Sequence, residues 1–510
     1  HTFFSGSAAF ALVLSLLVPI ADAATVYVDN TLAANCASGY STASRSCSGG
    51  AATGYRTIAE ALSAAQAGDT VLLRAGTYTE RLIPPRSGIP EAYITIKNYS
   101  GESPTLTGAS EPAIFLLNRS YLIIDGLRVD NVVGWGRLED SSYNIIRNSR
   151  FSRATSTGTT GGLKLVRSTY NKILSNTFED GNDSLTIQES DRNLVQDNIF
   201  IKARHSLFSL RCGNYNVILA NMLNNTDQKA GEIYDCEGTS DAPIKLDATK
   251  RNLVEGNRFS YTLASSADYR YNGIQYSGQN GIVRRNVFYD NQGGGLNFQV
   301  YANEALYNYG HRVYNNTFFN NRCYAIAASS SGTSVQYSDN KVKNNLFYKN
   351  VGCAGESSQT NIGNTGAVIL ENNAVASTSP SFISETTNDL RLTSSSTMID
   401  AGVFVTQTVG AGSGTQMTVG DVGYFFDGYG IPGESGDTIQ LSGQNQTAHI
   451  TAIDYATRTL TLGQPLTWSD RQGLHLTYSG SAPDMGAYEV VSGAGTAPSA
   501  ATNLRATTGR

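Results

Sequence analysis

The sequence predicts an all-β protein, a solenoid in which short strands stack coil upon coil. Two observations carry this prediction: a short phrase that recurs, and the alternation of apolar and polar residues inside it. The phrase reads Tyr-Asn-Ile-Ile-Arg-Asn-Ser-Arg-Phe from Tyr143 to Phe151, and seven later copies end between Phe178 and Phe347, with steps of 27, 22, 23, 36, 29, 30 and 29 residues. The alternation indicates strands. Because no copy is long enough to bury its own apolar face, neighbouring copies must stack.

Asparagine recurs at one place in the phrase, two residues before its closing apolar residue. Asn tolerates left-handed backbone and hydrogen-bonds its neighbours, so we expect it at the corners of the coils. Stacked about 4.8 Å apart, the side-chain amides can also bond one another in a ladder. The recurring residues are Asn176, Asn198, Asn221, Asn257, Asn286, Asn316 and Asn345.

The alternative solenoid, a leucine-rich horseshoe, requires leucines at set spacings and alternating helices, and the repeat has neither. The pattern of short strands and corner asparagines resembles the right-handed parallel β-helix of pectate-lyase-like proteins. That resemblance implies a right-handed parallel β-helix over residues 24–402.

The N-terminal residues 1–23 read as a signal peptide. Residues 10–20 are an apolar run, and Ala21-Asp22-Ala23 resembles a cleavage site, so we expect cleavage after Ala23. The run is too short to span a membrane. We therefore expect a secreted protein that does not insert into membranes.

The first coils follow an N-terminal cap. Thr25 to Val28 reads as the opening strand, and the capping box Thr57-Ile-Ala-Glu60 predicts a short helix through Ala67. A solenoid needs such a cap because its open end exposes core and unpaired strand edges. The strands predicted next are Thr70–Arg74, Tyr93–Lys97, Ala113–Leu117 and Tyr121–Val129.

The repeat fades after Phe347. Residues 380–382, 389–392 and 398–402 resemble the closing coil of this fold, and its usual continuation, 482–491, comes only about 80 residues later. Residues 403–481 between them alternate as strands do, and we interpret them as a small β domain inserted into the last coil. Residues 492–510 read as a linker and the start of a truncated domain that resembles fibronectin type III.

The composition of the chain limits the kinds of ligand that it can bind. The chain has 510 residues, a net charge of -5 and only 15% charged residues, so it lacks the basic footprint of a nucleic-acid-binding protein. We expect a monomer that binds a polysaccharide, and 28 Tyr are available to stack on sugars. In an exported chain, six cysteines indicate disulfides. From their spacing we expect the pairs Cys36–Cys47, Cys212–Cys236 and Cys323–Cys353.

Candidate site residues follow from aligning the coils on the first Asn of each phrase. This alignment places Leu163, Leu185 and Phe208 inside. It places two columns of polar side chains on one outer face, with neighbours about 5 Å apart. One column holds Lys164, Thr186, Ser209, Lys245 and Gly273, and the other holds Val166, Gln188, Arg211, Asp247 and Gln275.

This constellation points to β-elimination on an acidic polysaccharide. The reaction removes a proton next to a carboxylate, which Arg211 can neutralise by a bidentate contact. Lys245 is the candidate base, and His205 is a candidate base or proton donor. The remaining substrate-binding candidates are Gln188, Glu189, Asp247, Lys164, Tyr271 and Gln275, with Glu232 a further candidate.

The segment Ser209-Leu-Arg-Cys-Gly213 is similar to a signature of the alginate lyase and chondroitinase B family. The resemblance implies that Arg211 is the acid or neutralising residue. The preceding coil reads Glu189-Ser-Asp-Arg-Asn193, so Glu189 stands where that family has its lysine base. Lys245 would then have to act in its place.

Three alternatives stay open. The acidic loop with Asp180, Asn182 and Asp183 offers oxygen ligands for Ca²⁺, although no cofactor is certain. A glycoside hydrolase would need two carboxylates at a defined separation. A non-catalytic adhesin or carbohydrate-binding surface would use the same scaffold.

Overall fold

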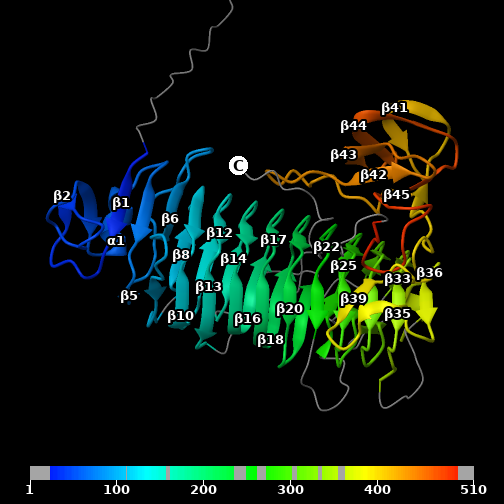
Figure 1. Cartoon of the computed structure of the whole chain (residues 1–510), viewed down its shortest axis with the longest axis horizontal. Coiled ribbons are helices and arrows are strands. Elements are labelled where there is room, and N and C mark those ends of the chain that lie inside the picture. Colours follow the sequence, from blue (N-terminus) through cyan, green and yellow to red (C-terminus); the bar gives the residue numbers. More distant parts are fainter. Residues whose placement is uncertain are drawn as a thin grey trace, which may run out of the picture.

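The computed structural model describes residues 23–491 except 111, 157–160, 235–248, 261–270, 301–306, 331–335, 354–361 and 364. The chain winds into a long parallel β-helix, and a smaller sheet lies beside its C-terminal part (Figure 1). The predicted all-β solenoid is confirmed. Three walls of strands enclose the core, and we name them A, B and C.

Wall A is a 15-stranded sheet to which each coil adds one strand. Its strands pair in parallel register from coil to coil, as Ile146 does with Ile173, except for the antiparallel pair β2 and β3. They are β1 (Thr25–Val28), β2 (Cys36–Tyr40), β3 (Ala52–Tyr55), β4 (Thr70–Leu73), β6 (Ile94–Asn98), β9 (Leu122–Asp125), β12 (Ile145–Arg147), β15 (Lys172–Leu174), β17 (Leu194–Gln196), β19 (Val217–Leu219), β22 (Leu253–Glu255), β26 (Ile282–Arg284), β30 (Arg312–Tyr314), β34 (Lys341–Lys343) and β36 (Ile369–Glu371).

Walls B and C belong to one 19-stranded sheet. Wall B contains β5 (Thr77–Tyr78), β7 (Thr105–Leu106), β10 (Arg128–Val132), β13 (Arg150–Ala154), β20 (Met222–Asn224), β23 (Arg258–Ser260), β27 (Val287–Tyr289), β31 (Thr317–Phe319), β35 (Leu346–Tyr348) and β37 (Ala374–Ala376). Wall C contains β8 (Ile114–Leu117), β11 (Gly136–Glu139), β14 (Leu163–Val166), β21 (Lys229–Tyr234), β24 (Ile274–Tyr276), β28 (Leu296–Val300) and β32 (Ile326–Ser330). Beside wall C, a three-stranded sheet is formed by β25 (Gly278–Gln279), β29 (Tyr307–Tyr309) and β33 (Gln336–Ser338).

Two long strands join walls B and C. β16 (Thr177–Gln188) and β18 (Ile199–Arg211) begin on wall B, pass the corner and end on wall C. Their pairing slips between Gly181 and Asp183, where a β-bulge bends the strands. The residues at this corner therefore lie between two outer faces.

The core is a continuous column of apolar side chains. The closing residues of the repeated phrase stack ring on ring, with Phe178 4.9 Å from Phe151 and 4.8 Å from Phe200 between ring centroids. The predicted inward residues of wall C, such as Leu185 and Phe208, are buried. This agreement confirms the prediction of which side chains face inward on these coils.

The asparagine ladder is confirmed, but its backbone conformation differs from the prediction. Each amide donates to the next Asn, as Asn198 Nδ2 does to Asn221 Oδ1 at 3.0 Å and Asn221 Nδ2 to Asn257 Oδ1 at 2.9 Å. The left-handed residue is the one before each Asn, for example Ala220 with φ of 55°. That residue turns the corner, and the Asn after it points inward, where its amide meets the next coil.

The N-terminal cap is shorter than predicted. Helix α1 (Ile58–Ala64) has Thr57 as N-cap, which accepts a hydrogen bond from Glu60 N at 3.2 Å. The helix ends before Ala67 because the Asp69 carboxylate accepts from Gln66 N at 2.7 Å and draws the chain out of the helix.

Two of the three predicted disulfides are confirmed, Cys36–Cys47 and Cys323–Cys353. Cys212 is also disulfide-bonded, and its expected partner Cys236 lies outside the described residues. The predicted signal peptide, except for Ala23, and the linker after residue 491 also lie outside them. In the described part of the chain, no helix has the length and apolar character needed to cross a membrane.

The segment 403–481 contains a six-stranded antiparallel sheet. The chain enters it after a short 3-10 helix η2 (Thr365–Ala367) and the hairpin of β38 (Phe382–Ser384) and β39 (Asp389–Leu392). The two ends of the segment lie together, since Gly402 N donates to Pro483 O at 2.7 Å. Its strands are β40 (Thr406–Gln407), β41 (Gly412–Thr418), β42 (Thr438–Leu441), β43 (Thr447–Asp454), β44 (Thr459–Trp468) and β45 (Gly473–Leu476).

This small domain covers part of wall A. Outward residues of wall A such as Val217 and Leu253 share one apolar cluster with Phe425 of the domain. Within the contact, the buried Arg284 bonds Asp437 of the domain at 2.6 Å and Glu255 of wall A at 2.7 Å. Wall B is covered on the later coils as well, where Val287 and Phe319 pack against Phe382 of the β38–β39 hairpin.

We expect Asn221→Ala to lower the free energy of unfolding by about 3 kcal/mol, because buried groups lose their partners. Asn198 would lose its acceptor, and the carbonyl of Val195 would lose its donor. The matched control is Met222→Ala, at an outward side chain that is 46% exposed, with an expected change within about 0.5 kcal/mol. Urea unfolding followed by circular dichroism measures both. Equal midpoints for the two variants would contradict a structural role for the ladder.

Candidate functional site

A cluster of polar side chains lies on the outer face of wall C, where β14, β16, β18, β21 and β24 are neighbours. Ser209 on β18 is paired in register with Thr186 on one side and Glu232 on the other. Two residues along, Arg211 lies between Gln188 and Tyr234. Lys164 extends the first column before Thr186, and Gln275 extends it after Glu232.

The predicted columns are therefore wrong beyond β18. The positions expected for Lys245 and Asp247 are held by Glu232 and Tyr234, and Gln275 belongs to the column of Ser209 instead of that of Arg211. Lys245 and Asp247 lie outside the described residues. The error for Lys245 and Asp247 arose because the 36-residue coil carries its extra residues after its wall C strand, and the prediction placed them before it.

Glu232 is the centre of the cluster. Its carboxylate is fully buried, with Lys229 Nζ 2.8 Å from Oε2 and Arg211 Nη2 4.0 Å from Oε1. The hydroxyl of Tyr234 also donates to it. A buried carboxylate is stable only with such partners, so Glu232 holds two cations at fixed places beside the outer face.

Arg211 remains accessible while its position is fixed. Its side chain is 29% exposed. Its guanidinium lies 5.0 Å from the centre of the Tyr234 ring, and its Nε donates to Ser209 Oγ at 3.4 Å. An arginine held in this way can offer its outer N–H groups to an anionic ligand.

His205 and Asp183 form a second pair at the corner between walls B and C. His205 Nδ1 lies 2.7 Å from Asp183 Oδ1, and Ser206 Oγ donates to the same oxygen at 2.9 Å. The Asp183 carboxylate raises the pKa of His205 above its usual value, against the effect of burial. Burial opposes ionisation of Asp183, but the hydrogen bonds from His205 and Ser206 hold its pKa below the usual range. The His205 side chain is 34% exposed, so part of the ring is in contact with solvent.

Lys164 has the opposite shift. Burial lowers its pKa, and repulsion from Arg137 and Arg211 lowers the pKa further. Within the described part of the chain, its ammonium group makes no hydrogen bond or ion pair. Lys164 thus loses its proton more readily than an ordinary lysine.

The other predicted residues are divided between this cluster and its surroundings. Gln275 joins the cluster, since it accepts from Lys229 Nζ at 3.3 Å, and Gln188 lies beside Arg211. Glu189 follows Gln188 at the corner with φ of 49°. Tyr271 precedes β24, where its carbonyl accepts from Gly293 N.

The predicted calcium ligands do not share partners. Asp180 lies 3.5 Å from Lys202 on wall B, whereas Asp183 is buried against His205, and Asn182 lies between them at the bulge. Asp183, His205 and Glu232 do bring three ligand atoms within 4.8 Å of one another. Because Lys229 and Arg211 already supply positive charge there, this trio suits proton transfer better than it suits a divalent cation.

Sequence reasoning missed Lys229, Tyr234 and Ser206, and it named Glu232 only as a further candidate. One signal was present in the segment Lys229 to Tyr234. Gly231 and Ile233 alternate there with polar residues, as the inward residues of the other wall C strands do. The small Gly231 is required, because a Cβ at that place would lie 2.3 Å from the buried Phe208 ring.

Comparison with known proteins gives a family match and several fold similarities. The family described as "Right handed beta helix region" matches residues 92–235 and 165–347, together just over half of the chain. An uncharacterized protein of Bacillus subtilis (strain 168), YwoF, is 34% identical over 85 residues, which cover 15% of this chain and 18% of that protein.

Two of the similar solved structures are lyases. The pectate lyase Pel9A has a TM-score of 0.43 and 13% identity, over 92% of this chain and 96% of that chain. A PL6 family polysaccharide lyase from Pseudopedobacter saltans has a TM-score of 0.39 and 15% identity, over 66% of this chain and 95% of that chain. Similarity at these levels concerns the fold alone.

We expect Asp183→Asn to lower the pKa of His205 by about 1–3 units, because it removes the charge that stabilises the imidazolium. Titration of the imidazole protons by NMR measures this pKa. The buried His311 and His475, whose pKa values burial lowers to about 3, do not interfere near neutral pH. The control is Asp180→Asn, three residues earlier and paired with Lys202. An unchanged His205 pKa in Asp183→Asn would show that the pair does not set its protonation.

Proposed function

This chain belongs to the right-handed β-helix family, and we propose that it is a polysaccharide lyase that cleaves a uronate-containing chain by β-elimination on wall C. The observation that carries the proposal is the arrangement around Arg211. An accessible arginine lies on the same wall as a lysine of lowered pKa and at the side of a histidine of raised pKa. Groups whose pKa values are shifted in opposite directions are suited to act as base and acid.

The reaction requires three tasks. A base takes the proton from C5 of the uronate, next to its carboxylate. The electron pair of that C–H bond forms the C4=C5 double bond as the C4–O bond breaks. A proton donor then protonates the departing glycosidic oxygen. Each task needs its own group at the outer face of the wall.

Arg211 neutralises the uronate carboxylate. Removing a proton beside a carboxylate places further negative charge on that group, so a fixed cation lowers the barrier. Ser209, Tyr234 and Glu232 hold the guanidinium in place before the substrate arrives. This assignment agrees with the role that the sequence resemblance implies for Arg211.

Lys164 is the base. It lies two strands from Ser209, about 10 Å along the wall, and its repulsion from Arg211 places the two cationic side chains within electrostatic reach. A uronate between the two side chains would contact both. Lys245, the base predicted from the sequence, remains the alternative base. Mutation of each lysine distinguishes the two.

His205 donates the proton to the leaving oxygen. Its pairing with Asp183 favours the protonated imidazole, which a donor must be when the bond breaks. Buried carboxylates of Asp183 and Glu232 lie behind it.

A glycoside hydrolase on this scaffold is the second candidate. Asp183 and Glu232 are close enough to be compared with the carboxyl pair of a retaining glycosidase. Such an enzyme needs one carboxyl with a raised pKa as its acid. The pKa of Asp183 is lowered instead, and Glu232 is held by Lys229, which favours the lyase.

We expect the protein to release products with ultraviolet absorbance from at least one of polygalacturonate, alginate and chondroitin, and none from a neutral glycan. Arg211→Ala should lower kcat/KM by about 10²–10³-fold, because it removes the charge stabilisation. Lys164→Met should lower kcat/KM by about 10²–10⁴-fold, because it removes the base. Initial rates of absorbance increase measure both.

The control is Arg471→Ala, whose side chain is 85% exposed on the small domain. New reducing ends without absorbance would replace the lyase by a hydrolase. Binding without any product would leave a carbohydrate-binding surface. A larger loss in Lys245→Met than in Lys164→Met would reassign the base.

A further inference from the structure

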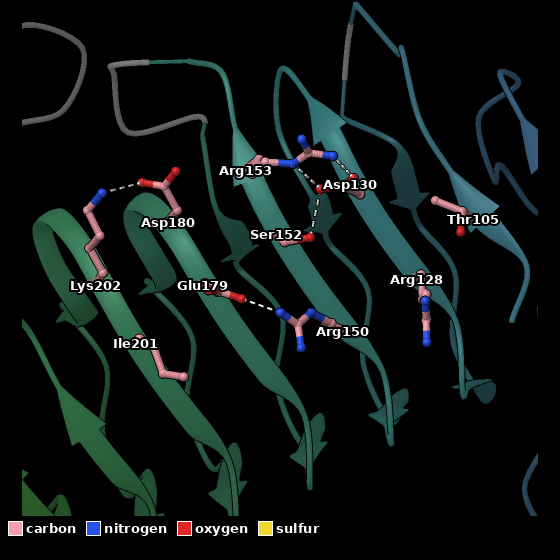
Figure 2. Close-up of a pocket in the computed structure, with 10 residues that line it drawn as sticks. All are labelled: Thr105, Arg128, Asp130, Arg150, Ser152, Arg153, Glu179, Asp180, Ile201 and Lys202. Carbon is pink, nitrogen blue, oxygen red and sulfur yellow. Dashed lines mark hydrogen bonds and ion pairs between the residues drawn. The ribbon is translucent and has the colours of Figure 1, made fainter.

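A second charged surface lies around the corner from the candidate active site, on wall B. It is a groove of about 610 Å³ that crosses β7, β10, β13, β16 and β18 (Figure 2). Its cations are Arg128, Arg150, Arg153 and Lys202. None of these four residues was predicted from the sequence to have a role.

The groove carries more positive than negative charge in a chain whose net charge is -5. Three carboxylates line it, and each is paired: Glu179 with Arg150, Asp130 with Arg153, and Asp180 with Lys202. Arg128 is the fourth cation. It is exposed, and within the described residues its guanidinium forms no hydrogen bond or ion pair (Figure 2).

The paired cations also keep donors for a ligand. The side chains of Arg150 and Arg153 are 55% and 63% exposed. Ion pairs at this exposure are weak and exchange readily with solvent. An incoming anion can therefore bind Arg150 without the loss of a buried interaction.

The spacing of the arginines follows the coils. Arg128 and Arg150 are direct register partners on adjacent parallel strands, so their backbones lie about 4.8 Å apart. This distance is comparable to the length of one sugar unit in an extended chain. A chain of uronates lying across the strands would present successive carboxylates to the two guanidinium groups.

Exposed apolar side chains lie at and beside the groove. Ile201 lines it, and Ile199 and Met222 lie on the same wall, with exposures of 38%, 40% and 46%. Cations beside exposed apolar surface suit an acidic sugar chain, because its carboxylates can meet the cations while the C–H faces of its rings pack on the apolar side chains. A duplex nucleic acid would need a more strongly basic surface.

The groove and the candidate active site share two strands. On β16, Glu179 and Asp180 face the groove and Asp183 belongs to the site. On β18, Lys202 faces the groove and His205 belongs to the site. Since the strands bend at the corner between them, one straight stretch of chain cannot lie on both surfaces.

We propose that the wall B groove is a second binding site for an acidic glycan, in which Arg128 and Arg150 hold successive carboxylates of a stretch outside the active site. The inference rests on the proposed function for the class of chain, and on the groove itself for the site. A polysaccharide held here keeps a neighbouring stretch close to wall C, which raises its effective concentration at the active site.

The test compares Arg128→Gln/Arg150→Gln with a matched control, Arg147→Gln. Arg147 lies on β12 of wall A, is 41% exposed, and pairs with Asp125 much as Arg150 pairs with Glu179. Both changes are made in the full chain carrying Arg211→Ala, so that bound glycan is not consumed. Affinity electrophoresis in gels containing polygalacturonate or alginate measures binding, with dextran and duplex DNA as probes of specificity.

We expect the double variant to lose at least tenfold in affinity for the acidic glycan that the parent binds, and the control to match the parent. With Arg211 intact, the double variant should turn over long chains more slowly but cleave short oligosaccharides at the parent rate. Equal affinity of the double variant and the parent would overturn the groove proposal, as would equal binding of dextran or DNA by the parent.

The two proposals fail separately. Cleavage that continues with no effect of the groove substitutions removes the groove and keeps the lyase. Groove-dependent binding by a protein that cleaves no acidic glycan removes the lyase and keeps the groove. If the protein neither binds nor cleaves any acidic glycan, both proposals are wrong.

Discussion

Hydrogen bonds between buried Asn side chains of successive coils fix the register on which the rest of the structure depends. Each amide in the ladder has a partner in the next coil, and a slip of one residue would leave the whole row unsatisfied in the core. The fixed register also sets the positions of the side chains on the outer faces. A polar side chain on one coil has a defined neighbour on the next, so a site can be assembled from residues 20 to 40 positions apart in sequence.

The candidate site shows how such a scaffold holds charges that would otherwise repel. Lys164, Arg211, Lys229 and His205 lie on or beside one wall, and the buried carboxylates of Glu232 and Asp183 compensate them from behind. A buried carboxylate that loses its charged partner strongly destabilises the fold. The cations therefore keep their places, while Arg211 and His205 stay accessible to a ligand.

The candidate site on wall C and the groove on wall B differ in how their charges are arranged. In the site on wall C, the carboxylates of Glu232 and Asp183 are buried and hold the cations in place, which suits catalysis. On wall B the ion pairs are exposed and exchangeable, which suits reversible binding. The bend in β16 and β18 separates the two surfaces by only a few residues. Wall A takes no part over the later coils because the small domain covers it with apolar side chains and the Arg284 ion pairs.

The sequence alone determined the features that repeat or that are local. The alternation within each phrase identified its strands, and the step of the repeat identified the stacking Asn side chains. Alignment of the coils on the first Asn of each phrase identified inward residues such as Leu185 and Phe208. The capping box placed the start of α1 at Thr57, and the resemblance of one coil drew attention to Arg211. These features follow from short-range patterns that each coil carries by itself.

Only the tertiary structure decided which strand lies next to β18 on wall C. In the 36-residue coil the alternation does not tell whether the added residues precede or follow the wall C strand, so the sequence offered Lys245 and Asp247 where the fold places Glu232 and Tyr234. The bulge that turns Asp180 and Asp183 to different partners could not be predicted from the sequence either. Both outcomes depend on how a coil closes against its neighbours. Backbone pairing between coils and core packing settle that closure, and neither is present in one coil's sequence.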